Sequence, residues 1–216
     1  TLWVNEDYFR EAEKHFCDLL TPYCTPDESL KLLYDREMDT LPIYGFGIKG
    51  FMLSLIETAS AIMGEHLNAA IINKLLEIGK EMLNKPIHLL PHVESTLKAL
   101  QGKYRLVLVT KGDLLDQERK LEKSELTNYF HHIEVMSNKH EEDYSRLIGH
   151  LDIQPKDFMM IGNSLRSDIL PVCSIGANAI YVPYDITWQH ETVDQHDIKN
   201  IDFIAVSNLS EVLQHL

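Results

Sequence analysis

The protein has 216 residues, of which 33 are acidic and 20 are lysine or arginine, so its formal net charge is −13. This length suits a single domain, or a core domain with a smaller inserted lobe. Binding of duplex nucleic acid requires a concentrated basic surface, so the composition argues against a nucleic-acid partner. A phosphorylated ligand would need a local cluster of positive groups within this acidic chain.

Cysteine usage and hydropathy indicate the compartment in which the protein works. The three cysteines, Cys17, Cys24 and Cys173, are odd in number and show no paired framework, which favours a reducing environment. The sequence has no apolar run long enough to span a bilayer and no charged-then-apolar leader. We therefore expect a soluble, cytoplasmic protein with no membrane partner.

Residues 5–84 have the apolar periodicity of helices and no convincing strand pattern. One helix start is sharp, because Thr25 can cap it, Pro26 suits its first turn and Glu28 completes a capping box. A loop with Pro42 and three glycines follows this helix. The predicted helices cover residues 5–20, a segment beginning after Thr25, residues 51–63 and residues 67–83.

The chain changes character after Pro86, where short β-rich apolar runs alternate with helical patterns. The predicted strands cover residues 104–110, 133–136, 158–162, 179–182 and 203–206, and the helices cover 93–100, 114–123, 141–151, 167–175 and 209–216. Such alternation indicates a parallel sheet covered by helices on both faces. The sequence therefore predicts an α/β fold: a Rossmann-like parallel sheet core of residues 1–4 and 85–216, carrying a helical insertion of residues 5–84.

Thr110, Lys111 and Gly112 follow the first predicted strand. In open α/β sheets, ligands bind beyond the carboxyl ends of the strands. A hydroxyl group there can donate to a phosphate oxygen, and a glycine lets backbone amides approach an anion closely. The alternative is an ordinary strand-to-helix turn in which Asp113 caps the next helix.

Two further strand ends carry residues that suit a phosphate and a cation. Lys139 follows the second strand and could balance phosphate charge, although a solvated loop lysine is the commoner case. Asn163 and Asp168 follow the third strand, and oxygen ligands with one or two carboxylates suit Mg²⁺. The alternative for Asp168 is a stabilising charge in the first turn of a helix.

A threonine, a lysine and an aspartate in this order, at successive strand ends, resemble the haloacid dehalogenase superfamily of hydrolases. Residues 91–112 resemble the second motif of that family, with Thr110 as the matching hydroxyl. Lys139 matches the lysine of the third motif, and residues 157–171 resemble the fourth. The resemblance covers nearly the whole chain.

The resemblance implies a Mg²⁺-dependent phosphatase of a small phosphorylated metabolite. The implied roles are Thr110 and Lys139 in catalysis; Thr110, Lys111, Gly112 and Lys49 in substrate binding; and Asp168 and Asn163 at the metal. The helical insertion resembles the α-helical cap that closes over such sites, and Lys49 lies in its glycine-rich loop. A solvated lysine at a helix start is the commoner alternative for Lys49.

The first motif of the family reads Asp-x-Asp-x-Thr at the end of a central strand. The chain opens with Thr1, Leu2 and Trp3, which resemble the end of that motif. The nucleophilic aspartate would then stand four residues before Thr1, and the acid/base aspartate two before. Loss of a central strand would leave unpaired backbone groups and a split core, so we expect the physical protein to include residues upstream of Thr1.

Asn163 leaves other functions open, because phosphatases of this family usually have an aspartate at this place. Metal-free 2-haloacid dehalogenases carry an asparagine in this region with serine neighbours, although theirs lies closer to the final aspartate than Asn163 does to Asp168. A metal-free 2-haloacid dehalogenase is therefore the alternative enzyme. A non-catalytic binding protein on the same fold is the alternative if the first-motif aspartates are absent.

Overall fold

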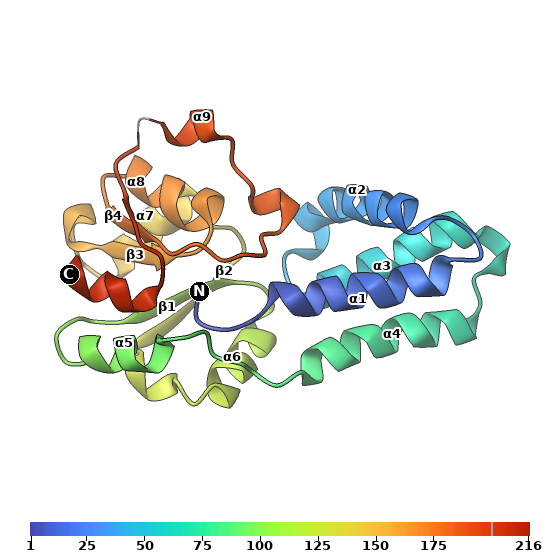
Figure 1. Ribbon diagram of the computed structural model, residues 1–216, viewed down its shortest axis with the longest axis horizontal. Helices are drawn as coiled ribbons and strands as arrows, with labels where there is room; N and C mark the ends of the chain where they lie inside the picture. The colour runs from blue at the N-terminus through green and yellow to red at the C-terminus, as the bar shows by residue number, and fades with distance from the viewer. Residues whose placement is uncertain (200) are drawn as a thin grey trace. The chain divides into compact units, whose positions relative to one another are not determined.

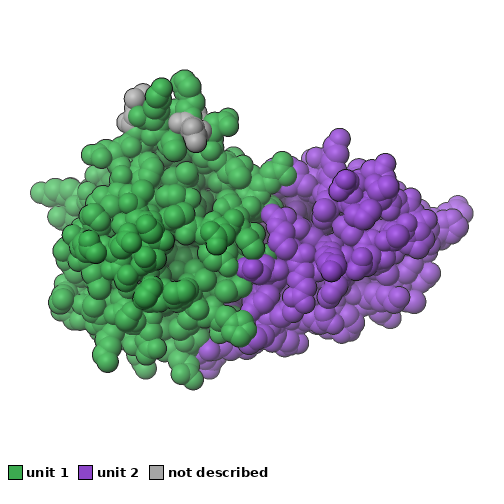
Figure 2. Space-filling model, viewed as in Figure 1, with its two compact units in different colours: residues 1–6, 87–110, 124–216 green, residues 7–86, 111–123 purple. Residues whose placement is uncertain are grey.

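The computed structural model describes residues 1–199 and 201–216, which divide into two compact units (Figure 2). Unit 1 comprises residues 1–6, 87–110 and 124–216. Unit 2 comprises residues 7–86 and 111–123. Residues 111–123 of unit 2 belong to the stretch 85–216 that the sequence predicts as part of the core. The role of unit 2 as a cap stays a prediction.

Unit 2 is helical (Figure 1). Its helices are α1 (Glu6–Leu20), α2 (Pro26–Tyr44), α3 (Ile48–Met63), α4 (Ala69–Asn84) and α6 (Leu114–Lys123), with a short 3₁₀ turn at Gly64–His66. The predicted capping box of α2 is present, since the Thr25 hydroxyl accepts from the Glu28 amide and the Glu28 carboxylate accepts from the Thr25 amide. The helices account for the apolar periodicity read from the sequence.

The loop predicted to begin at Pro42 is shorter than expected. Helix α2 continues through Pro42 to Tyr44 and is capped by Gly45, whose amide donates to the Leu41 carbonyl at 2.9 Å. Proline lacks one backbone donor, but here the loss falls in the last turn, where the helix is about to end. Gly45 has φ +72, a left-handed conformation that glycine adopts without steric cost.

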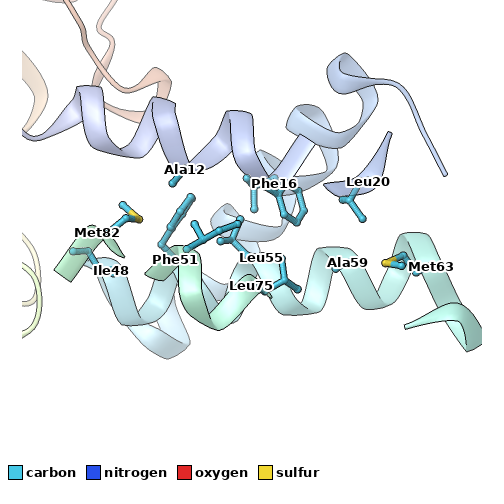
Figure 3. Packing of buried hydrophobic residues seen from close by; sticks show 12 residues of the cluster. Ala12, Phe16, Leu20, Ile48, Phe51, Leu55, Ala59, Met63, Leu75 and Met82 are labelled. Carbon is cyan, nitrogen blue, oxygen red and sulfur yellow. The ribbon is translucent and has the colours of Figure 1, made fainter. Parts of the chain in front are cut away.

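The apolar core of unit 2 lies among α1, α2, α3 and α4 (Figure 3). Phe9 and Phe51 meet edge to face, with ring centroids 5.1 Å apart. The side chains that are wholly buried there include Phe16, Leu20, Leu55 and Leu75. Truncating one such leucine to alanine typically costs about 2 to 5 kcal/mol, so this core stabilises the unit substantially.

Unit 1 has the alternating pattern expected of an α/β fold. Its main elements are α5 (Val93–Leu100), β1 (Val107–Lys111), β2 (His132–Met136), α7 (Glu141–His150), β3 (Met159–Gly162), α8 (Leu170–Ser174), β4 (Asn178–Tyr181), α9 (Gln195–Ile198) and β5 (Ile204–Ala205). The last residue of β1, Lys111, is grouped with unit 2. Short 3₁₀ turns occur at Thr127–Tyr129, Pro155–Asp157, Gln189–Glu191 and Leu209–Gln214.

Two predicted helices differ from expectation. The helix predicted over residues 167–175 is a π-helical turn at Leu165–Ile169 followed by the short α8. The terminal helix predicted over residues 209–216 is the 3₁₀ turn Leu209–Gln214. Both sequences have helical periodicity, but periodicity does not distinguish α from tighter or wider turns when the segment is short.

Within the described residues, the strands form two separate sheets instead of the single sheet predicted. One sheet pairs β1 with β2, and the other has the order β3-β4-β5. Strands β3 and β4 are parallel, with Met159 opposite Asn178 and Gly162 opposite Tyr181, and β4 is parallel to β5. The predicted α/β class is confirmed, while no described strand joins the two sheets.

The first residues of the chain run antiparallel to the segment before α5. The Leu90 amide donates to the Leu2 carbonyl, and the Val4 amide donates to the His88 carbonyl, each at 2.9 Å. Trp3 and Leu89 form the bridge between them. Among residues 1–199 and 201–216, no helix has the length and apolarity needed to cross a bilayer.

Candidate active site

The carboxyl ends of β2 and β3 bring two of the predicted site residues together in unit 1. The Lys139 ammonium donates to Asp168 Oδ1 at 2.7 Å. The two side chains are only 9% and 6% exposed. Burying a charge is costly unless it is paired, so each of these groups depends on the other.

The π-helical turn after β3 carries the Asp168 carboxylate. The Ser164 amide donates to Asp168 Oδ2 at 3.0 Å, and the Asp168 amide donates to the Ser164 carbonyl at 2.8 Å. A Cβ on Gly162 would lie 2.3 to 2.4 Å from the Asp168 side chain, so only glycine permits this approach. Gly162 is thus required by its packing against the aspartate.

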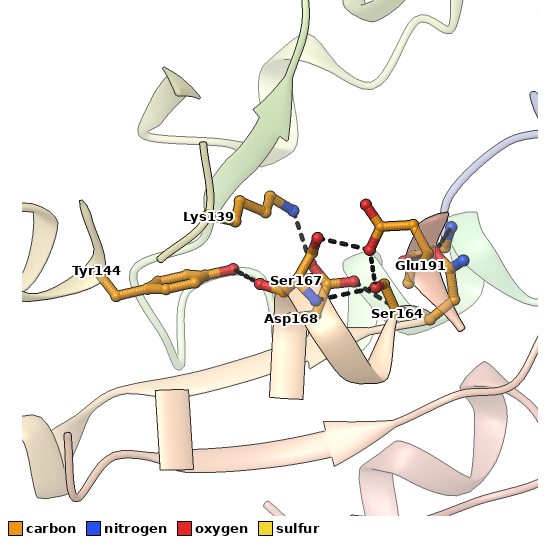
Figure 4. A network of polar contacts seen from close by, with 8 residues as sticks. Lys139, Tyr144, Ser164, Ser167, Asp168 and Glu191 are labelled. Carbon is orange, nitrogen blue, oxygen red and sulfur yellow. Dashed lines mark hydrogen bonds and ion pairs between the residues drawn. The ribbon is translucent and has the colours of Figure 1, made fainter. Parts of the chain in front are cut away.

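Sequence reasoning missed the polar network around this turn (Figure 4). The Glu191 carboxylate accepts hydrogen bonds from the hydroxyl groups of Ser164 and Ser167. The Tyr144 hydroxyl donates to the Ser167 carbonyl at 2.9 Å. The two serines beside Asp168 were visible in the sequence, but no local pattern could connect them with a glutamate 27 residues further along the chain.

Tyr144 lies at the centre of the apolar core of unit 1, where its side chain is fully buried. Burial raises the pKa of the Tyr144 phenol well above its usual value, and the negative charges of Asp168 and Glu191 act in the same direction. The phenol therefore stays protonated and serves as a permanent donor to the turn that carries Asp168.

Asn163 lies next to this turn, and its side-chain oxygen already accepts two hydrogen bonds. The Thr1 hydroxyl donates to Asn163 Oδ1 at 2.6 Å, and the Thr1 backbone nitrogen donates to the same oxygen at 2.7 Å. This contact joins the start of the chain to the loop after β3. The chain order would not reveal it, since the two residues are 162 positions apart.

The donor set can be compared with the needs of a magnesium ion. In the part of the chain that the structure describes, no three histidine, cysteine, aspartate or glutamate side chains are grouped so that they could hold a metal ion. The oxygen donors of Asp168 and Asn163 are of the hard type that Mg²⁺ prefers, and this ion commonly takes one or two carboxylates and completes its shell with water or phosphate. By donor type both residues fit magnesium, with Asp168 as the charged ligand, while the Asn163 oxygen would have to give up a hydrogen bond from Thr1 to bind the ion.

The other predicted residues lie at the end of β1 and in unit 2. Thr110 is the penultimate residue of β1, the neighbour of β2, and its role in the site stays a prediction. The Lys111 ammonium stands 3.9 Å from the centroid of the Phe46 ring. Gly112 has φ +130, a backbone conformation that residues with a side chain rarely adopt, so this turn favours glycine.

Lys49 is engaged within unit 2. Its ammonium donates to Asp113 Oδ1 at 2.9 Å, and this hydrogen bond is the main cause that lowers the pKa of the Asp113 carboxyl. Asp113 also accepts from the Asp116 amide at 3.2 Å, so its predicted role as a cap of α6 is confirmed. The Lys49 side chain remains 56% exposed, which leaves it accessible to solvent.

Comparisons with known proteins identify the family. A family model for haloacid dehalogenase-like hydrolases matches residues 48–182. Two curated relatives, the N-acylneuraminate-9-phosphatases of Rattus norvegicus and Homo sapiens, are 33% and 32% identical over 92 residues, which is 40% of this chain. The matched segment spans 37% of the length of each of these relatives.

A solved structure is similar over the whole of this chain. A haloacid dehalogenase-like family hydrolase from Xanthomonas campestris is 36% identical, with a TM-score of 0.87 over 100% of this chain and 87% of that one. The family model covers more than half of the chain and this likeness covers all of it. The chain therefore belongs to the haloacid dehalogenase-like hydrolases.

Proposed function

We propose that the protein is a Mg²⁺-dependent phosphatase of a small phosphorylated metabolite. The observation that carries the proposal is the buried Lys139–Asp168 pair at the ends of β2 and β3. A lysine and a carboxylate held together there suit a site that must gather a phosphate and a cation. The similarity to two N-acylneuraminate-9-phosphatases, limited to 92 residues, supports phosphate esters as the substrate class.

The proposed reaction passes through an aspartyl phosphate. A carboxylate upstream of Thr1 would attack phosphorus as the ester P–O bond breaks, and a second upstream aspartate would protonate the leaving oxygen. Water, deprotonated by that second aspartate, would then cleave the aspartyl phosphate and release inorganic phosphate. The separation of β1–β2 from β3–β4–β5 supports the idea that a further strand belongs between them.

The described residues would hold the phosphate and the metal. Lys139 would donate to a phosphate oxygen and offset charge as it builds up, and Thr110 would donate a hydroxyl hydrogen bond. Asp168 and Asn163 would supply oxygen ligands to magnesium, which when bound would neutralise phosphate charge. Lys111, Gly112 and Lys49 are proposed to contact the substrate, with unit 2 acting as the cap over the site. We also propose a cytoplasmic location.

The test uses the full-length protein, including any residues upstream of Thr1, whose intact mass establishes their presence. We expect hydrolysis of p-nitrophenyl phosphate with Mg²⁺, loss on chelation and recovery when Mg²⁺ is returned. Asp168→Asn should lower kcat by at least about a hundredfold, whereas Asp194→Asn, an exposed carboxylate outside the site, should not. Metal-independent halide release from a 2-haloacid, without phosphate release, would replace the proposal by the dehalogenase alternative.

A further inference from the structure

The carboxylate of Glu191 reaches the turn that carries Asp168 from a different part of the chain. Glu191 ends the 3₁₀ turn Gln189–Glu191, which lies in the segment after β4. Its Oε2 atom accepts from the Ser167 hydroxyl at 2.6 Å and from the Ser164 hydroxyl. One carboxylate oxygen therefore joins Ser164, which precedes the turn, to Ser167, which lies within it, as Figure 4 shows.

Several hydrogen bonds hold the turn from within, and the side chains of Ser164 and Asp168 take part in them. Residues Leu165–Ile169 form a single π-helical turn, in which the Ser164 carbonyl accepts from the amides of both Asp168 and Ile169, at 2.8 and 3.3 Å. The π-helix is rare and occurs mostly as single turns, frequently at functional sites. Contacts from outside add to the hydrogen bonds within this turn.

The serine hydroxyls supply one of these contacts. The Ser164 hydroxyl accepts from the Ser167 amide at 3.0 Å, as an N-cap does, and donates its own proton to Glu191. The two serines are only 9% and 6% exposed, so water cannot readily replace the glutamate as their acceptor. Loss of an acceptor from a buried hydroxyl leaves a donor unsatisfied, which is more costly than loss of an exposed hydrogen bond.

A second contact joins the same two segments. Arg166 Nη1, in the turn, donates to the His190 carbonyl at 3.0 Å. The Tyr144 hydroxyl donates to the Ser167 carbonyl at 2.9 Å. The turn that carries Asp168 is thus held from two sides. His190 and Glu191 contact it from the segment after β4, and Tyr144 contacts it from α7.

We propose that Glu191 is a positioning residue, whose carboxylate holds the serine turn in the geometry that presents Asp168 to Lys139 and to a bound cation. Its effect on the turn follows from the contacts alone. Its effect on magnesium and on catalysis rests on the proposed function. Because the role is to accept two hydrogen bonds, a glutamine, whose amide oxygen can also accept them, should replace the glutamate better than alanine does.

The test compares Glu191→Ala, Glu191→Gln and Asp194→Ala in the full-length protein, the last being a control at an exposed carboxylate of the same segment. Amide hydrogen exchange is measured for residues 163–169 and, as a check on global folding, for α5. In Glu191→Ala we expect exchange at 163–169 to quicken by about tenfold, with α5 unchanged. Glu191→Gln should lie closer to wild type than to Glu191→Ala, and Asp194→Ala should match wild type.

Magnesium gives a second readout that does not depend on turnover. The Mg²⁺ concentration needed for half of the maximal thermal stabilisation should rise by about tenfold in Glu191→Ala. Glutamine should recover most of this change. If the alanine variant unfolds, Ser167→Ala, which removes one of the two hydroxyl donors, should show the same local change in exchange to a smaller degree.

The outcomes separate this proposal from the proposed function. Unchanged exchange at 163–169 in both Glu191→Ala and Ser167→Ala would overturn the positioning role, and so would a glutamine variant as perturbed as the alanine one. Absence of Mg²⁺ binding and of phosphatase activity in the wild type would overturn the proposed function while leaving the exchange result to decide the role of Glu191.

Discussion

Lys139 and Asp168 are 29 residues apart in the sequence, yet the lysine ammonium and the aspartate carboxylate oxygen are 2.7 Å apart. Both side chains are almost fully shielded from water. Apolar residues of similar volume would often stabilise the fold at least as well as this buried ion pair. Stability alone therefore does not explain the pair, which points to a functional role. Its position at two strand ends makes it the natural centre of the candidate site.

Removing one partner of this pair should destabilise the fold strongly. Lys139→Ala leaves the Asp168 carboxylate buried without its counter-charge, so we expect the free energy of unfolding to fall by about 3 to 5 kcal/mol in urea titrations. The control is Lys80→Ala, which breaks an ion pair with Glu77 whose side chains are 59% and 60% exposed, and which should cost less than about 1 kcal/mol. Equal costs for the two variants would contradict a special role for the buried pair.

Asn163→Asp should strengthen magnesium binding. An aspartate oxygen can still accept the two hydrogen bonds from Thr1, which are 2.6 and 2.7 Å long. The aspartate also adds a negatively charged oxygen ligand for the metal beside Asp168. We expect the Mg²⁺ dissociation constant, measured by calorimetric titration, to fall by about tenfold. Asn163→Ala should weaken binding, and an unchanged dissociation constant in both variants would place Asn163 outside the metal site.

Tyr144→Phe tests the support of the turn from the core. Removing the hydroxyl deletes its 2.9 Å hydrogen bond to the Ser167 carbonyl inside a fully buried environment. The variant should lose about 1 to 3 kcal/mol of unfolding free energy. A matched change at an exposed site, Tyr104→Phe, should leave stability unchanged, because that side chain is 45% exposed.

The same tyrosine should make stability depend on alkaline pH. Burial raises the pKa of the Tyr144 phenol above the ordinary value of 10.0, so its contribution is fully present below that value and is lost as the pH rises beyond it. Ultraviolet difference spectra should show phenolate from Tyr144 only as the protein unfolds. Ionisation of Tyr144 in the folded protein, found by comparison with Tyr144→Phe, would refute this assignment.

The Lys49–Asp113 pair should contribute to stability at neutral pH and lose its effect in acid. The hydrogen bond from Lys49 lowers the pKa of Asp113 below 3.8, so the stabilisation is present above that value and disappears as the pH falls through the lower, folded-state pKa. The melting temperature of Asp113→Asn should therefore lie below wild type at neutral pH and approach it in acid. Asp194→Asn, an exposed control, should follow wild type throughout, and a constant gap for Asp113→Asn would exclude the ion pair as its cause.

Periodicity and capping residues in the sequence determine much of the secondary structure of this protein. The helical stretch after Thr25, the alternation after Pro86 and the polar residues at strand ends follow from local rules of hydrogen bonding and burial. The order Thr110, Lys139 and Asp168 was enough to suggest the family. The inferences about local structure succeed because each depends on neighbours within a few residues along the chain.

The tertiary structure decided what local rules cannot reach. Sequence alone did not reveal that Glu191 accepts from Ser164, that Thr1 contacts Asn163, or that the strands divide into two sheets. Nor did it reveal that the turn before α8 is π-helical. Such features depend on burial and on hydrogen bonds between residues far apart in sequence. The partner of a buried side chain is determined by the residues that surround it in the folded protein and not by its neighbours in the chain.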